Sequence, residues 1–126
     1  ELFANFRMYY ALCRTGYKVY MNNTVYTGAQ IADMYRKSYE ETLARGIASD
    51  GDGLMYVMTR MADTEGWEPF RKAFRELYGL DPAVSCGATK WEKIDCFFSV
   101  VSRYASKDLL ETYFTPAQIA ALKTLK

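Results

Sequence analysis

The sequence contains no histidine among its 126 residues. This absence excludes catalysis by a Ser-His-Asp triad or a Cys-His pair within the chain. It also excludes an ordinary self-contained catalytic zinc site, because such sites usually bind the metal through histidine side chains. The chain by itself therefore lacks the parts of the commonest hydrolytic centres.

Long apolar runs and an excess of charge of one sign are also missing. A membrane span needs about 20 consecutive apolar residues, and the sequence has no such run. Lys and Arg together number 16 and Asp and Glu 15, which gives a net charge of +1 with both signs interspersed. We therefore expect no membrane span and no binding to nucleic acid or to an anionic membrane surface.

Cysteine is scarce, with Cys13, Cys86 and Cys96 as the only three. They show no C-x-x-C spacing, which disfavours a structural zinc site. Cys13 and Cys96 fall on apolar helical faces, which predicts buried thiols. In an oxidising compartment either a Cys86–Cys96 or a Cys13–Cys96 disulfide is open, and the odd count leaves one thiol unpaired.

Apolar residues make up 50% of the sequence and aromatic residues 16%. A chain of this length buries about two-thirds of the surface that it exposes when unfolded. The composition therefore predicts a folded chain rather than a disordered one. We expect a single helical domain over residues 1–126. Because residue 1 already lies inside a helical pattern, we interpret this domain as a fragment, the C-terminal subdomain of a larger protein.

Apolar residues recur at helical spacing along most of the chain. Leu2, Phe6 and Tyr9 mark a first helix over residues 2–14, which Gly16 ends. Further helices are predicted over about 28–45, 54–65, 69–78, 90–105, 108–114 and 116–125. Their short connections and unequal lengths predict an irregular array of six to seven helices rather than an up-down bundle.

Three of the predicted helices start with a capping box, in which a threonine and a residue three positions later satisfy each other's backbone amides. These boxes are Thr27-Gly28-Ala29-Gln30, Thr89-Lys90-Trp91-Glu92 and Thr115-Pro116-Ala117-Gln118. Asp50 or Asp52 is expected to cap the helix that follows the SDGDG loop. Ser106 is expected to cap the short segment DLLETYF.

Residues 17–26 favour strands, because Tyr17, Val19 and Val25 have high β-propensity. The Asn22-Asn23 pair between them predicts the turn of a hairpin. Asn22-Asn23-Thr24 also fits a glycosylation sequon, but asparagine in a turn is the better account. The predicted fold class is therefore mainly α, with one short β-hairpin near residues 17–26.

Met55, Met58 and Met61 form a row at helical spacing, which predicts core packing rather than an adaptable binding face. The chain also contains 11 tyrosines. Exposed tyrosine and tryptophan rings could stack on sugars or peptides. One hypothesis is therefore a non-catalytic helical module that binds protein or carbohydrate.

The opening segment ELFAN resembles the second zinc-binding segment of gluzincin metallopeptidases. Glu1-Leu2-Phe3-Ala4 fits the E-x-x-A pattern around the glutamate that serves as the third zinc ligand in that class. Residues 52–77 and 90–114 are similar to the helical C-terminal part of the enhancin-like, mucin-targeting peptidases of the class. Without that resemblance, a glutamate at a helix start reads as a favourable charge at the positive end of the helix dipole.

The resemblance implies that the chain is the C-terminal helical subdomain of a secreted or cell-surface zinc metallopeptidase, bacterial in origin. Glu1 would bind zinc in the parent protein, while the H-E-x-x-H helix with its general base would lie upstream. This chain alone would then hold no zinc and hydrolyse nothing. With histidine absent, Tyr10 or Tyr56 would help to stabilise the transition state. The expected partners are the upstream catalytic part of the polypeptide and a protein or glycoprotein substrate.

Overall fold

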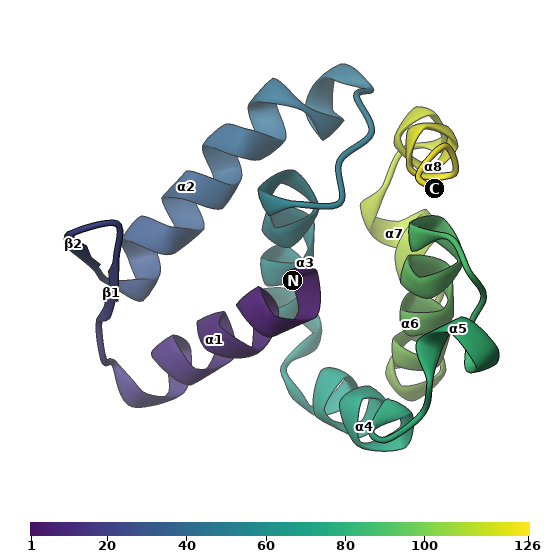
Figure 1. Ribbon diagram of the computed structural model, residues 1–126, viewed down its shortest axis with the longest axis horizontal. Coiled ribbons are helices and arrows are strands. Elements are labelled where there is room, and N and C mark those ends of the chain that lie inside the picture. Colours follow the sequence, from purple (N-terminus) through teal and green to yellow (C-terminus); the bar gives the residue numbers. More distant parts are fainter.

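The computed structural model describes all residues from 1 to 126 and contains eight α-helices and a two-stranded sheet (Figure 1). The elements are α1 (Leu2–Thr15), β1 (Val19–Met21), β2 (Thr24–Tyr26), α2 (Gly28–Glu41), α3 (Asp52–Glu65), α4 (Glu68–Leu77), α5 (Pro82–Ser85), α6 (Lys90–Ala105), α7 (Leu109–Tyr113) and α8 (Pro116–Leu122). A 3-10 turn, η1 (Leu43–Arg45), follows α2. The predicted mainly helical fold with one hairpin is confirmed. No helix combines the length and the apolar character that crossing a bilayer requires.

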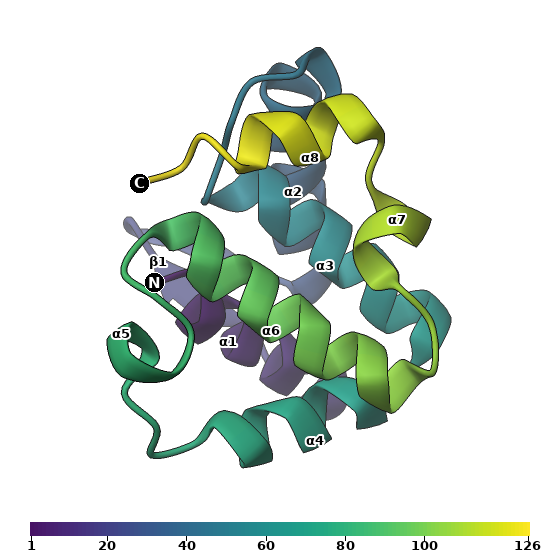
Figure 2. The ribbon, with the colours of Figure 1, turned by 90° about the vertical axis from the view of Figure 1, so that its right-hand side faces the viewer.

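Helix α3 forms the centre of the array, where it contacts α1, α2 and α7 (Figure 1). A helix that is buried on several faces must be apolar around most of its circumference. Accordingly, Met55, Met58 and Met61 are each 0% exposed, which confirms the predicted core row. Helix α6 packs against α4 on the far side of the molecule from α2 (Figure 2).

The three capping boxes are confirmed at the starts of α2, α6 and α8. In each of them the threonine hydroxyl accepts a hydrogen bond from the amide three residues later, and that residue's side chain accepts one from the threonine amide. These bonds satisfy donors that a helix start otherwise leaves free. Such local pairs do not depend on the rest of the fold, which is why they can be recognised in the sequence.

The predicted aspartate cap of α3 is wrong. The N-cap is Gly51, whose amide donates to Ser49 Oγ at 3.4 Å, and no side chain of the N-cap residue caps the first turn. The carboxylate of Asp50 instead pairs with Nζ of Lys90 at 2.7 Å, across to the start of α6. Asp52 lies inside the first turn of α3, where its charge favours the helix dipole without capping it.

Two features in the second half of the chain also differ from what the sequence predicts. Ser106 has a φ of 56° and ends α6, whereas Asp108 caps α7 by accepting from the amide of Glu111. Asp81 caps an additional short helix, α5, which lies between the helices predicted over about 69–78 and 90–105. A four-residue helix carries too little periodicity to be recognised in the sequence.

The helix predicted over residues 28–45 is broken at Thr42, where φ is −121° and ψ is −93°. The Thr42 hydroxyl donates to the carbonyl of Ser38 at 2.8 Å, and η1 continues the chain to Gly46. Gly53 of α3 lies directly against this hydroxyl, so that a Cβ atom at position 53 would collide with Thr42. The break therefore lies at a point where the end of α2 contacts the start of α3.

Replacing Gly53 with alanine should lower the free energy of unfolding by about 1–3 kcal/mol, because overpacking a tight contact costs about that much. Chemical denaturation followed by circular dichroism would measure the loss. Gly28→Ala is the matched control, since a Cβ there meets only Leu12 at an ordinary 3.6 Å. Equal stabilities of the two variants would show that Thr42 can move aside freely.

Cys86 and Cys96 form a disulfide with their Cα atoms 5.5 Å apart, which ties the loop after α5 to α6. Of the two bridges left open by the sequence, the structure contains this one. The predicted burial of the Cys13 thiol is wrong, because Cys13 is free and exposed. The buried face of α1 is formed instead by Phe6, Tyr9 and Leu12.

The hairpin pairs β1 with β2 in antiparallel fashion, with Val19 opposite Tyr26. Its turn is formed by Asn22 and Asn23 at φ values of 49° and 60°, as the sequence predicts. Val19 and Tyr26 pack against the core. The ring of Tyr20, on the opposite face of β1, is 67% exposed.

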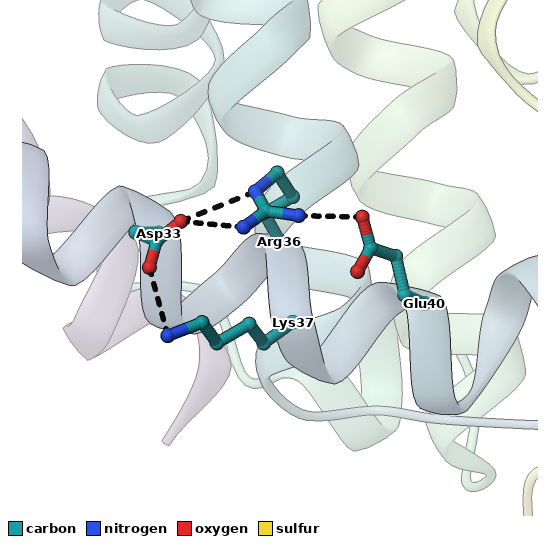
Figure 3. Close-up of polar contacts among 4 residues, drawn as sticks. All are labelled: Asp33, Arg36, Lys37 and Glu40. Atoms are coloured by element: carbon teal, nitrogen blue, oxygen red, sulfur yellow. Dashed lines mark hydrogen bonds and ion pairs between the residues drawn. The ribbon is translucent and has the colours of Figure 1, made fainter.

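The outer face of α2 carries a ladder of opposite charges (Figure 3). Arg36 contacts Asp33 at 2.7 Å and Glu40 at 2.6 Å, and Lys37 contacts Asp33 at 3.1 Å. The Arg36 guanidinium holds the pKa of Asp33 below its usual value. Exposed pairs of this kind contribute little to stability, so this face is a solvated surface rather than a candidate site.

Helix α8 is held to α2 and η1 by Gln118, which is 6% exposed. Its Nε2 donates to the Tyr39 hydroxyl at 2.9 Å and to the Leu43 carbonyl at 3.2 Å. The same residue also closes the capping box of α8 through its Oε1. Gln118 thus caps its own helix and also holds that helix to distant elements of the chain.

Candidate functional site

A groove with a volume of 1470 Å³ is lined by the first part of α1, the start of α3, α4, α5 and the first half of α6. We call it the α1–α4–α6 groove. The start of α1, α5 and the start of α6 all contribute residues to its lining. The aromatic, charged and large apolar side chains of its lining include Glu1, Phe3, Arg7, Tyr10, Asp50, Asp52, Trp67, Arg71, Phe74, Arg75, Tyr78, Leu80, Lys90, Lys93 and Phe97.

The floor of the groove is made of aromatic rings that meet across it. Phe3 of α1 lies 4.6 Å from Phe97 of α6 and 6.1 Å from Phe74 of α4, measured between ring centroids. Further along α1, Tyr10 lies 4.9 Å from Trp67 in an edge-on arrangement. Phe97 is 2% exposed, whereas Phe3, Phe74, Tyr10 and Trp67 are half-buried, so these four rings contribute the apolar surface of the floor.

Five cationic side chains line the groove: Arg7, Arg71, Arg75, Lys90 and Lys93. Two of these cations are engaged within the chain, Arg71 with Glu68 at 3.3 Å and Lys90 with Asp50 at 2.7 Å. The other three, on α1, α4 and α6, make no ion pair. The groove therefore presents positive charge that the chain itself does not neutralise.

Three carboxylates line the end of the groove where α1 begins. The ion pair with Lys90 holds the pKa of Asp50 below its usual value. Partial burial, and to a lesser extent the nearby charge of Glu1, raise the pKa of Asp52. Glu1 is exposed at the start of α1, and its side chain makes no capping hydrogen bond. Its carboxylate is thus not committed to the helix start that it precedes.

The two tyrosines singled out in the sequence lie in different places. Tyr10 is half-buried and lines the groove. Tyr56 lies on α3 outside the groove, where its ring stacks 4.9 Å from Tyr39 and lies 5.8 Å from the Arg60 guanidinium. The fold therefore brings Glu1 and Tyr10 to one groove and leaves Tyr56 elsewhere.

No group of three or more His, Cys, Asp or Glu side chains is arranged to hold a metal ion. The residues of this chain therefore do not fit a complete zinc centre. Glu1 could supply one oxygen ligand, because it is exposed and not otherwise bonded. Any further ligands would have to come from outside the 126 residues.

Sequence reasoning missed the cations of the groove. Arg7, Arg75 and Lys93 are far apart in the sequence, where they look like ordinary charges on helix faces. The signal that could have found them is their position beside aromatic residues of three helices predicted to pack together. Compared with known proteins, the chain matches no family model, no curated protein and no solved structure.

Proposed function

We propose that the chain is the helical part of a zinc metallopeptidase of the gluzincin type. In this proposal Glu1 supplies one zinc ligand, and the α1–α4–α6 groove receives part of a protein or glycoprotein substrate. The observation that carries the proposal is the exposed, uncommitted carboxylate of Glu1 at a groove of 1470 Å³. The resemblance of ELFAN to the glutamate-bearing segment of gluzincins supports it.

The remaining ligands and the general base would come from an H-E-x-x-H helix of the same polypeptide, because this chain contains no histidine. In such a centre zinc acidifies a bound water and polarises the scissile carbonyl. This chain would hold one carboxylate in place and form one wall of the substrate cleft. Tyr10, which borders the groove, is the better placed of the two tyrosines to contact substrate.

The cysteine chemistry supports the proposed location of the protein. A disulfide between Cys86 and Cys96 persists in an oxidising environment and is rare in the cytosol. This supports the proposal that the protein acts outside the cell or at its surface.

The decisive test is Glu1→Gln in the polypeptide that includes the sequence preceding residue 1. The amide keeps the shape of the side chain but loses its charge, so zinc affinity should fall by at least about 100-fold, more than the loss of an outer-shell partner costs. Zinc content and hydrolysis of a glycoprotein substrate would be measured on the same samples. Glu41→Gln is the control, because Glu41 is exposed on α2 and makes no ion pair.

Two results would reject the proposal. One is a preceding sequence without an H-E-x-x-H pair, and the other is a Glu1→Gln variant that binds zinc as tightly as the Glu41→Gln control. Loss of hydrolysis with unchanged zinc content would also contradict the role of Glu1 as a ligand.

A second candidate function is carbohydrate binding by the hairpin, and the exposure of its rings favours it. Tyr17 is 74% exposed and Tyr20 67%, although neither is needed for the core. A Tyr17→Ala/Tyr20→Ala variant should lose about 1 kcal/mol or more of binding free energy for each ring that stacks on a sugar. A glycan array probed with the variant and the parent chain would measure this, and identical binding profiles would remove the hairpin as a binding surface.

A further inference from the structure

The α1–α4–α6 groove exposes large apolar side chains at its edge as well as on its floor. Tyr78 is 84% exposed and Leu80 49%, in the loop between α4 and α5. The floor rings of Phe3 and Phe74 are only half-buried. Apolar surface gathered in a concave region, rather than scattered singly, is typical of a binding site.

Three of the five cations that line the groove form no ion pair within the chain. Arg7, Arg75 and Lys93 come from three different helices, line the same groove and make no ion pair. Six of the 16 cations of the chain form ion pairs, for example Arg103 with Glu76 at 2.7 Å and Lys107 with Glu65 at 3.0 Å, so what sets these three apart is their position beside an apolar floor. A ligand with negative charge would form ion pairs with these three unpaired cations.

The size of the groove indicates a short extended segment. The part of α1 that lines it runs from residue 1 to residue 10, which is about 14 Å at 1.5 Å per residue. An extended chain covers that distance in about four residues at roughly 3.3 Å each. Four residues in alternating orientation would place some side chains on the aromatic floor and others toward the cations.

We propose that the groove binds an extended peptide segment that carries both acidic and apolar side chains. The apolar side chains pack on Phe3, Phe74 and Leu80, and the carboxylates pair with Arg7, Arg75 and Lys93. This inference names the substrate class of the proposed peptidase and rests on that function for its place beside a catalytic centre. The binding itself needs neither zinc nor an active enzyme.

The mixed charge of the groove argues against a general polyanion site. Glu1 and Asp52 also line it, and two of its five cations are already paired. Nucleic acids and sulfated glycans bind through many phosphates or sulfates in a row, which requires a continuous positive track. A short acidic peptide needs only a few cations at defined places.

The test is fluorescence anisotropy of the 126-residue chain with four labelled peptides of equal length. One alternates Leu and Glu, one Leu and Lys, one Leu and Gln, and one Gly and Glu. The Leu-Glu peptide should bind at least about tenfold more tightly than each of the others, because it alone uses both floor and cations. Arg7→Glu/Arg75→Glu should remove that preference, whereas Lys18→Glu/Arg45→Glu changes the net charge equally and should retain it.

Binding in the groove should also change the fluorescence of Trp67, read in a Trp91→Phe variant that leaves one indole. Absence of binding by the Leu-Glu peptide would overturn the proposal, as would equal binding of the Leu-Gln or Gly-Glu peptide. Full competition by heparin at equivalent charge would show a general polyanion site and would also overturn it. If the longer polypeptide binds the Leu-Glu peptide but shows neither zinc binding nor hydrolysis, the metallopeptidase proposal is rejected and the peptide-binding proposal is supported. If it shows zinc-dependent hydrolysis but no preference among the peptides, the peptide-binding proposal is rejected and the metallopeptidase proposal is supported.

Discussion

Replacing Phe97 with alanine is expected to lower the free energy of unfolding by about 3–5 kcal/mol, the usual cost of deleting a buried phenylalanine ring. Phe97 is 2% exposed and lies within 5.7 Å of the rings of Phe3, Phe74 and Phe98. Its removal would leave a cavity between α1, α4 and α6 and withdraw support from the floor of the groove. Thermal or urea denaturation would measure the loss.

Tyr78→Ala is the matched control for this substitution, because it deletes an aromatic ring that is 84% exposed. Its effect on stability should stay within about 0.5 kcal/mol. If Phe97→Ala were no more destabilising than Tyr78→Ala, the packing of α1 on α6 described above would be wrong.

Replacing Cys86 and Cys96 together with serine should cost about 3 kcal/mol of stability. The bridge closes a loop with a sequence separation of 10 and so restricts the unfolded chain. The same variant should loosen α5 against α6, which forms one border of the groove. Denaturation midpoints of the variant and the parent chain, both under oxidising conditions, would measure the difference.

Cys13→Ser controls for the loss of a thiol, because Cys13 is exposed and unpaired. It should leave stability within about 0.5 kcal/mol of the parent chain. A double serine variant as stable as Cys13→Ser would show that the bridge does not form in solution.

Features that depend on a few neighbouring residues could be predicted from the sequence. The capping boxes at Thr27, Thr89 and Thr115 and the Asn22-Asn23 turn need only local backbone geometry, and all four are present. The helical periodicity likewise predicted which faces are buried, as the methionine row of α3 illustrates.

Features set by contacts between distant elements could not be predicted. The break at Thr42 lies against Gly53 of another helix, a neighbour that the local sequence does not reveal. Asp50 looks like a helix cap in the sequence because Lys90, which pairs with it instead, lies 40 residues later in the chain. The exposure of Cys13 also depends on tertiary packing, because the partners of α1 cover only one side of it.

The candidate site shows the same division. Glu1 and Tyr10 were named from the sequence, and both border the groove. The cations Arg7, Arg75 and Lys93 come from three helices, and no spacing within one helix reveals that they share a surface. The groove itself exists only because α1 meets α4 and α6 through aromatic rings.

The hydrogen bonds of Gln118 affect how α8 unfolds. If α8 detached, the Tyr39 hydroxyl would lose the donor Gln118, the Leu43 carbonyl would keep only the Gly46 amide as donor, and Leu122, which is 0% exposed, would meet water. Fraying at the carboxyl end should stop at about Leu125, which packs against the core and accepts from the Trp91 amide at 3.3 Å, and the amide protons of α8 should exchange with solvent only when α2 also unfolds. The last helix of the chain would then belong to the same cooperative unit as its centre.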